Sequence, residues 1–91
     1  MTALTRTLTI VNRKGLHARA SARFVETVES HEASAAVTRE GQTVSGDSIM
    51  GLMMLAASQG TTIDVACEGT EAEALISALD RLVADRFGEE E

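Results

Sequence analysis

Residues 4–29 have the sequence LTRTLTIVNRKGLHARASARFVETVE, in which one hydrophobic spacing gives way to another. Over residues 4–11 polar and apolar side chains alternate, and Thr, Ile and Val are frequent. This predicts a β-strand with Leu8 and Ile10 facing the core. The polar residues 12–15 interrupt the alternation and predict a loop.

After the loop, apolar side chains recur at every fourth residue. Ala20, Phe24 and Val28 have this spacing, which places them on one face of a helix from Ala18 to about Glu29. The first third of the chain is therefore predicted to be a strand, a polar loop and an amphipathic helix.

The same two spacings recur in the rest of the chain and predict five more elements. Glu40-Gly41 indicates a hairpin turn, and Thr70 with Glu73 has the spacing of a capping box. The order β-α-β-β-α-β-α, with short connections and one-sided strands, predicts an α+β fold in which three helices cover one face of a four-stranded, largely antiparallel sheet. The five later elements are strands at 33–39 and 42–45, a helix at 49–58, a strand at 61–67 and a helix after Thr70.

Length and composition narrow the class of protein. A chain of 91 residues, 44% of them hydrophobic, predicts a single domain over 1–91 with the acidic residues 88–91 as a frayed tail. Cys67 is the only cysteine, which excludes an internal disulfide and suits a reducing compartment. Apolar runs are too short for a membrane span and residues 1–15 do not resemble a signal peptide. We therefore expect a monomeric cytoplasmic protein with no membrane contact.

The charge of the chain is unevenly distributed. A net charge of −6 argues against binding nucleic acid, because acidic surfaces repel phosphate backbones. Up to residue 23, however, the chain has basic side chains and no acidic one, which predicts a region that meets an anion or an acidic partner. Chance clustering in a short chain is the alternative. The basic residues are Arg6, Arg13, Lys14, Arg19 and Arg23.

His17 stands where the polar loop becomes a helix. The unpaired N–H groups of a first helical turn, together with the helix dipole, favour bound anions and disfavour a positive ring. We therefore expect a neutral, nucleophilic imidazole that can accept a phosphoryl group, with Arg19 stabilising the added charge and Gly15 allowing the loop to bend and the group to approach. The alternative is a histidine with no chemical role. No metal site is expected, because His31 and Cys67 lie on other elements.

Residues 48–55, SIMGLMML, are apolar on nearly every side. A small sheet covers only one face of a helix, so we expect part of this helix to be exposed, where flexible methionine side chains can fit several partners. Complete burial of the helix is the alternative. Ser48 is the expected N-cap, and a phosphate there would add about two negative charges beside the apolar surface.

Two segments together resemble the motifs of the histidine-containing phosphocarrier (HPr) family of the bacterial phosphotransferase system. Gly15-Leu16-His17-Ala18-Arg19 resembles the active-site motif of that family, and Asp47-Ser48-Ile49-Met50-Gly51-Leu52-Met53 resembles its serine-site motif. The length, the separation of the motifs and the predicted element order agree as well. The resemblance covers about residues 4–87 and implies an open-faced β-sandwich.

The resemblance also implies a function. His17 would take a phosphoryl group on Nδ1 from enzyme I, which draws it from phosphoenolpyruvate, and would pass it to a IIA-type protein. The chain would be a carrier rather than an enzyme, with no cofactor. Arg19 would steady the group beside Gly15 and Ala18, and Ser48 would match the residue that a dedicated serine kinase/phosphorylase modifies in some members. The implied docking residues are Arg23, Ile49, Met50 and Met53.

One position departs from the family motif, because Ala20 stands where proline usually follows the arginine. Proline favours the first helical turn, so this change should loosen the helix start slightly. It leaves open whether the chain serves sugar uptake or a regulatory branch tied to nitrogen metabolism. Two further hypotheses are a small acylphosphatase-like enzyme that uses Arg19 and Asn12, and an interaction module in which Ser48 is the switch.

Overall fold

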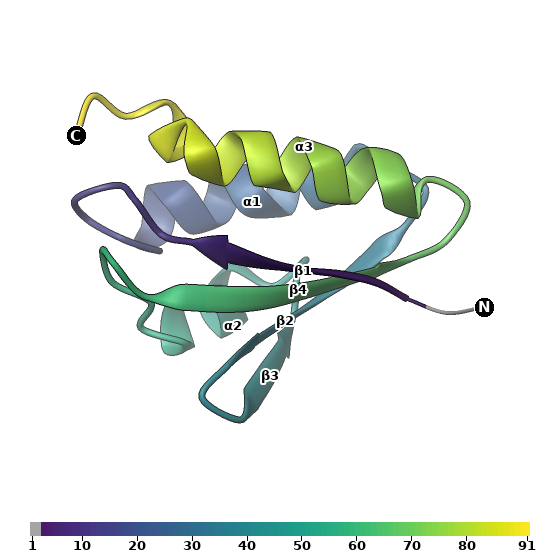
Figure 1. The fold of residues 1–91 in the computed structure, drawn as a ribbon, viewed down its shortest axis with the longest axis horizontal. Coiled ribbons are helices and arrows are strands. Elements are labelled where there is room, and N and C mark those ends of the chain that lie inside the picture. Colours follow the sequence, from purple (N-terminus) through teal and green to yellow (C-terminus); the bar gives the residue numbers. More distant parts are fainter. Residues whose placement is uncertain (1–2) are drawn as a thin grey trace.

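The computed structural model describes residues 3–91. Within them the elements are β1 (Leu4–Thr9), α1 (Ala18–Glu29), β2 (Ser34–Arg39), β3 (Gln42–Ser45), α2 (Ile49–Met54), β4 (Thr62–Glu68), α3 (Ala72–Ala84) and a short 3₁₀ helix, Arg86–Gly88. The strands form one sheet in the order β1-β4-β2-β3, and every neighbouring pair is antiparallel. The predicted α+β fold is confirmed (Figure 1).

One face of the sheet is covered and the other is bare. Figure 1 shows α1 and α3 running along the sheet, while α2 packs against α1 and β3. Because side chains alternate along a strand, the buried Ile63 and Val65 of β4 point to the helices and the exposed Thr62 and Asp64 do not. This arrangement is the open-faced sandwich that the resemblance implied.

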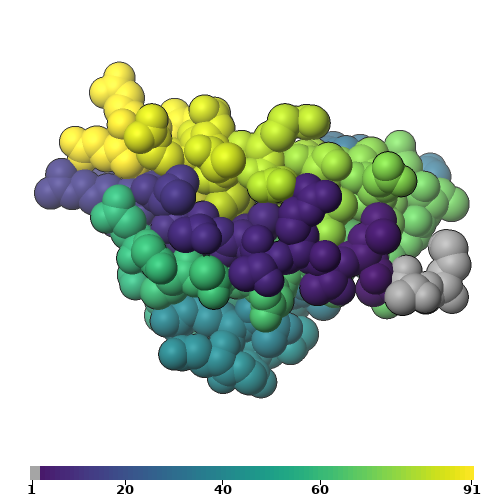
Figure 2. Space-filling view, in the orientation of Figure 1, coloured from purple at the N-terminus to yellow at the C-terminus, as the bar shows by residue number. Residues whose placement is uncertain are grey.

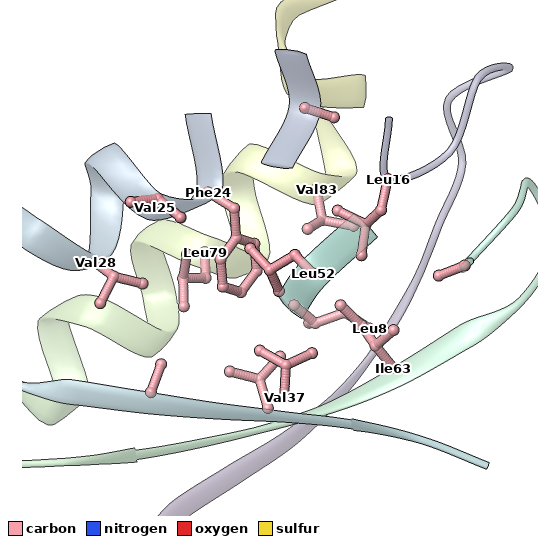
Figure 3. Close-up of a cluster of buried hydrophobic side chains, with 14 of the residues drawn as sticks. Leu8, Leu16, Phe24, Val25, Val28, Val37, Leu52, Ile63, Leu79 and Val83 are labelled. Atoms are coloured by element: carbon pink, nitrogen blue, oxygen red, sulfur yellow. The ribbon is translucent and has the colours of Figure 1, made fainter. Parts of the chain in front are cut away.

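The core is centred on Phe24 of α1, which is fully buried. Figure 3 shows its ring between Leu79 of α3 and Leu52 of α2, with Val37 of β2 below it. All three helices therefore meet the sheet at this aromatic side chain. The predicted spacing of Ala20, Phe24 and Val28 is confirmed, because all three are buried.

The hairpin is confirmed and the length of α2 is corrected. Glu40 and Gly41 have φ angles of 49° and 81°, as the two central residues of a type I′ turn require. The second helix ends at Met54 rather than Ser58. Ala56 has a φ of 51°, which ends the helix, and the chain then forms a loop that reaches the β1–α1 connection.

The predicted capping box does not form. Helix α3 begins at Ala72, after Glu71, with no side-chain hydrogen bond at its cap. The Thr70 hydroxyl instead donates to the carbonyl of Glu32 at 3.2 Å, and the Glu71 carboxylate accepts the N–H of Glu32 at 2.6 Å. Both side chains tie the helix start to the α1–β2 connection, a contact that local spacing could not predict.

The acidic tail, expected to fray, lies against the body of the protein. Phe87 is fully buried in the core and anchors the chain just before the tail. Arg86, Phe87 and Gly88 all have positive φ, so the backbone turns back after α3. Figure 2 shows the C-terminal residues (yellow) resting against the loop that follows β1 (purple).

Candidate functional site

The loop before α1 is held by backbone packing. Gly15 has a φ of 65°, and its Cα lies so close to the backbone of Ala57 that an added Cβ would stand 2.4 Å from the Ala57 oxygen. The N–H of Leu16 donates to the same oxygen at 2.9 Å, and the Leu16 side chain is buried. These contacts set the position at which the helix starts.

His17 is the N-cap of α1, as predicted. Its backbone is extended, and its ring Nδ1 accepts the N–H of Arg19 at 3.3 Å. The side chain is 27% exposed, so the ring lies at the surface within reach of a partner. Nδ1 therefore sits at the positive end of a 12-residue helix.

The other ring nitrogen meets a carboxylate from the far end of the chain. Nε2 of His17 lies 2.5 Å from Oε2 of Glu89, whose second oxygen accepts a hydrogen bond from Nδ2 of Asn12 at 3.0 Å. Asn12 is fully buried and also donates to the carbonyl of Gly15 at 2.9 Å. Sequence reasoning placed Asn12 in this loop but missed Glu89, because a separation of 72 residues has no local signal.

The environment of Glu89 keeps its carboxylate ionised. Burial alone would raise the pKa of Glu89, but the hydrogen bonds from Asn12 and His17, together with nearby positive charge, lower the pKa below its ordinary value of 4.5. The side chain of Glu89 is 16% exposed. Near neutral pH the partner of Nε2 is therefore an ionised carboxylate, which can only accept a hydrogen bond.

Four of the five basic residues that precede residue 24 lie around His17. Together with the tail residues 88–91 these four line a hollow of about 390 Å³. The uneven charge predicted that the basic region meets an anion or an acidic partner. Within the chain itself, the acidic C-terminal residues lie beside this region. Arg13 pairs with Glu91 at 2.8 Å, though this pair is exposed and contributes little stability. The basic residues of the hollow are Arg13, Lys14, Arg19 and Arg23, whereas Arg6 pairs with Asp80 on α3.

The second motif forms an exposed apolar surface. Ser48 is the N-cap of α2 and its hydroxyl accepts the N–H of Gly51 at 2.9 Å, which confirms the predicted cap. Leu52 and Leu55 are buried beneath the helix. The exposed side chains, which we call the methionine patch, are Ile49, Met50, Met53 and Met54.

His31 and Cys67, the other two residues considered as metal ligands, lie away from the hollow. His31 follows α1 and its Nδ1 lies 2.8 Å from the carbonyl of Thr27. Cys67 faces the core, where burial raises the pKa of its thiol and keeps it unreactive. Within residues 3–91 no three or more His, Cys, Asp or Glu side chains cluster as a metal site would require. None of the helices in this range combines the length and apolarity needed to cross a membrane.

Known proteins share both the sequence and the fold. A model of the family described as "PTS HPr component phosphorylation site" matches residues 4–85. The phosphocarrier protein HPr of Xylella fastidiosa strain Temecula1 is 42% identical over 83 residues, which cover 91% of this chain and 93% of that protein. The phosphocarrier protein NPr of Shewanella violacea is 35% identical, with 98% of both chains covered.

The structural comparison agrees. The crystal structure of HPr-C-His from Thermoanaerobacter tengcongensis superposes with a TM-score of 0.91 at 39% identity. The match covers 97% of this chain and 99% of that one. The similarity in fold therefore extends over nearly the whole of both chains.

Proposed function

Because this chain belongs to the HPr family of phosphocarrier proteins of the phosphotransferase system, we propose that it carries the phosphoryl group on Nδ1 of His17. The observation that carries the proposal is the N-cap position of His17, with Nδ1 at the first-turn N–H groups of α1. Backbone donors at a helix start stabilise an anion without any rearrangement.

The proposed reaction is a direct displacement at phosphorus. The lone pair of Nδ1 attacks the phosphoryl group of phosphorylated enzyme I, and the bond between phosphorus and the donor breaks with its electrons remaining on the donor. Arg19, exposed at the rim of the hollow, would pair with the phosphoryl oxygens. Transfer to a IIA-type protein reverses these steps on a new acceptor.

Ala20, in place of the usual proline, does not shift the start of α1 from its predicted position. It occupies the third position of α1, and α1 begins at Ala18 although the usual proline is absent. Ala20 is fully buried, so its backbone N–H is not offered to a phosphoryl group.

Phosphorus NMR tests the proposal. The protein is mixed with enzyme I and phosphoenolpyruvate, and we expect a phosphoramidate resonance that is lost in acid and decays when a IIA protein is added. An acid-stable resonance, or none, would contradict it. Steady release of phosphate from acetyl phosphate by the isolated chain would support the acylphosphatase-like alternative instead.

Two branches of the system could supply the donor. The relatives named HPr favour a sugar-linked enzyme I in the cytoplasm, and the similarity to a phosphocarrier protein named NPr favours a nitrogen-linked one. We propose the sugar-linked branch, since the relative named HPr from Xylella fastidiosa is 42% identical to this chain and the relative named NPr is 35% identical. Initial rates of phosphorylation with an enzyme I of each kind, at equal concentration, decide between them.

We further propose that partners dock on the methionine patch and Arg23, and that phosphorylation of Ser48 by a serine kinase weakens this docking. The patch is exposed, and Ser48 lies at its edge as the cap of α2. Apolar, methionine-rich surfaces adapt to several partners. A phosphate on Ser48 would bring charge that a docking partner has to desolvate.

Ser48→Asp imitates that charge. Aspartate also caps helices, so the fold should be retained, and we expect enzyme I to bind about tenfold more weakly. Titration calorimetry measures the affinity. Thr62→Asp adds the same charge on the bare face of the sheet and should have little effect. Equal affinity of the Ser48 variant and the wild type for both enzyme I and a IIA protein would refute the proposed switch.

A further inference from the structure

We propose that Glu89 is a positioning residue for His17, because its carboxylate, held by Asn12, accepts a hydrogen bond from the Nε2–H group and so leaves the ring lone pair on Nδ1. The inference rests on the proposed function of His17 and adds a residue from the other end of the chain.

The two contacts of the ring require the same tautomer. Nδ1 faces the N–H of Arg19, which can only donate, so Nδ1 must be an acceptor. Nε2 faces an ionised carboxylate, which can only accept, so Nε2 must carry the proton. A doubly protonated ring would turn a second proton toward the Arg19 N–H. The neutral ring with its proton on Nε2 satisfies both contacts.

Asn12 holds the carboxylate in place. Both contacts of its side-chain nitrogen are to acceptors, the Gly15 carbonyl and Glu89, so the amide cannot be turned over. The side chain is fully buried, and its Oδ1 finds no hydrogen-bond partner among residues 3–91. A buried acceptor without a partner costs stability. That cost is consistent with an asparagine required for its two donors.

The tail is held in place on both sides of Glu89. Phe87 is buried in the core, and the N–H of Glu89 donates to the carbonyl of Arg86 at 2.9 Å. The N–H of Arg13 also donates to the carbonyl of Glu91 at 2.9 Å. The carboxylate therefore lies on a segment that is attached on both sides.

The placement suits the chemistry of the proposed transfer. When Nδ1 forms its bond to phosphorus, the bond from phosphorus to the donor breaks with its electron pair, and the ring keeps its Nε2 proton and becomes positively charged. No proton has to move. The Glu89 carboxylate stabilises that positive ring, and the carboxylate and the phosphoryl group contact different nitrogens. Similar carboxylate–imidazole pairs orient histidines in enzymes and in metal sites.

Nitrogen-15 NMR of the ring tests the positioning role directly. The ring shifts are measured in the unphosphorylated protein at alkaline pH. We expect the wild type to show protonated Nε2 and unprotonated Nδ1. Glu89→Ala keeps only the Arg19 contact, so it should move both shifts part of the way toward the mixture of a free imidazole. Glu29→Gln removes the same charge from an exposed residue of α1 outside the hollow and should keep the wild-type shifts. Unchanged shifts in Glu89→Ala would overturn the proposal.

Kinetics separate orientation from charge. In Glu89→Gln the amide oxygen can still accept a hydrogen bond from Nε2–H but the side chain lacks the negative charge, so this variant should keep the tautomer and lower kcat for phosphoryl transfer. Glu89→Ala should lower kcat further, by at least about tenfold, with little change in KM because the methionine patch is intact. An equal loss in Glu29→Gln would show a general charge effect and refute the assignment. If the wild type accepts no phosphoryl group, the proposed function fails while the ring shifts still decide the role of Glu89.

Discussion

His17→Ala is expected to lose acid-labile phosphorylation by enzyme I and phosphoenolpyruvate, by at least about a thousandfold, because no other group replaces the attacking nitrogen. The fold should survive. The ring is at the surface, and the loss of an N-cap costs about 1 kcal/mol. Transfer of labelled phosphate measures the first effect, and thermal unfolding measures the second.

His31→Ala is the matched control for this variant. His31 is the other histidine of the chain, and its ring lies beside the carbonyl of Thr27 after the end of α1 rather than at a helix start. The control should be phosphorylated at the wild-type rate. Undiminished labelling of His17→Ala, or loss of labelling in His31→Ala, would exclude His17 as the carrier residue.

Gly15→Ala is expected to destabilise the protein by about 2–4 kcal/mol. A φ of 65° is unfavourable for alanine, and the new Cβ would stand 2.4 Å from the Ala57 oxygen and 2.9 Å from the Cα of Ser58. The loop has to move, which breaks the hydrogen bond from Leu16 to Ala57 and displaces His17. Urea unfolding measures the stability, and the transfer assay measures the displacement.

Gly60→Ala separates steric contact from backbone strain. Gly60 also has a positive φ, 89°, but among residues 3–91 nothing lies within 4 Å of the position that a Cβ would take. This control should lose only about 1–2 kcal/mol, the cost of the left-handed conformation. If both variants lose the same stability, close packing between Gly15 and Ala57 has no energetic importance.

The structure explains why glycine is needed at position 15 in a way that the sequence alone could not. From the sequence, glycine here allows a bend and close approach of a phosphoryl group, and the positive φ confirms the bend. The closest group, however, is the backbone of the loop after α2. Access of a phosphoryl group stays a prediction.

Elements with strong periodicity could be predicted well. Helix α1 has the predicted bounds because Ala20, Phe24 and Val28 recur at the spacing of a helical face, and burial of that face outweighs other local preferences. The alternation along β4 likewise predicted that Ile63 and Val65 face the core. Hydrophobic burial is read from spacing, and spacing is a property of the chain alone.

Side chains with a choice of partners could not be predicted. Thr70 has the spacing of a capping residue but hydrogen-bonds to Glu32, which is near it only in the folded protein. The helix predicted to end at Ser58 ends at Met54, where the following segment turns to reach the β1–α1 loop. In each case a contact between distant segments replaced a local one.

The layers, the helix start at His17 and the apolar surface that follows Ser48 could all be predicted from the order of residues, because each depends on spacing between near neighbours. The folded protein was needed to show that Glu89 and Asn12 flank the ring and that the acidic tail partly neutralises the basic loop. Phe87, buried beneath α1 and α3, turns the C-terminus back to the N-terminal loop. A hydrogen bond between residues 72 positions apart depends on how the core packs, and no local pattern encodes it.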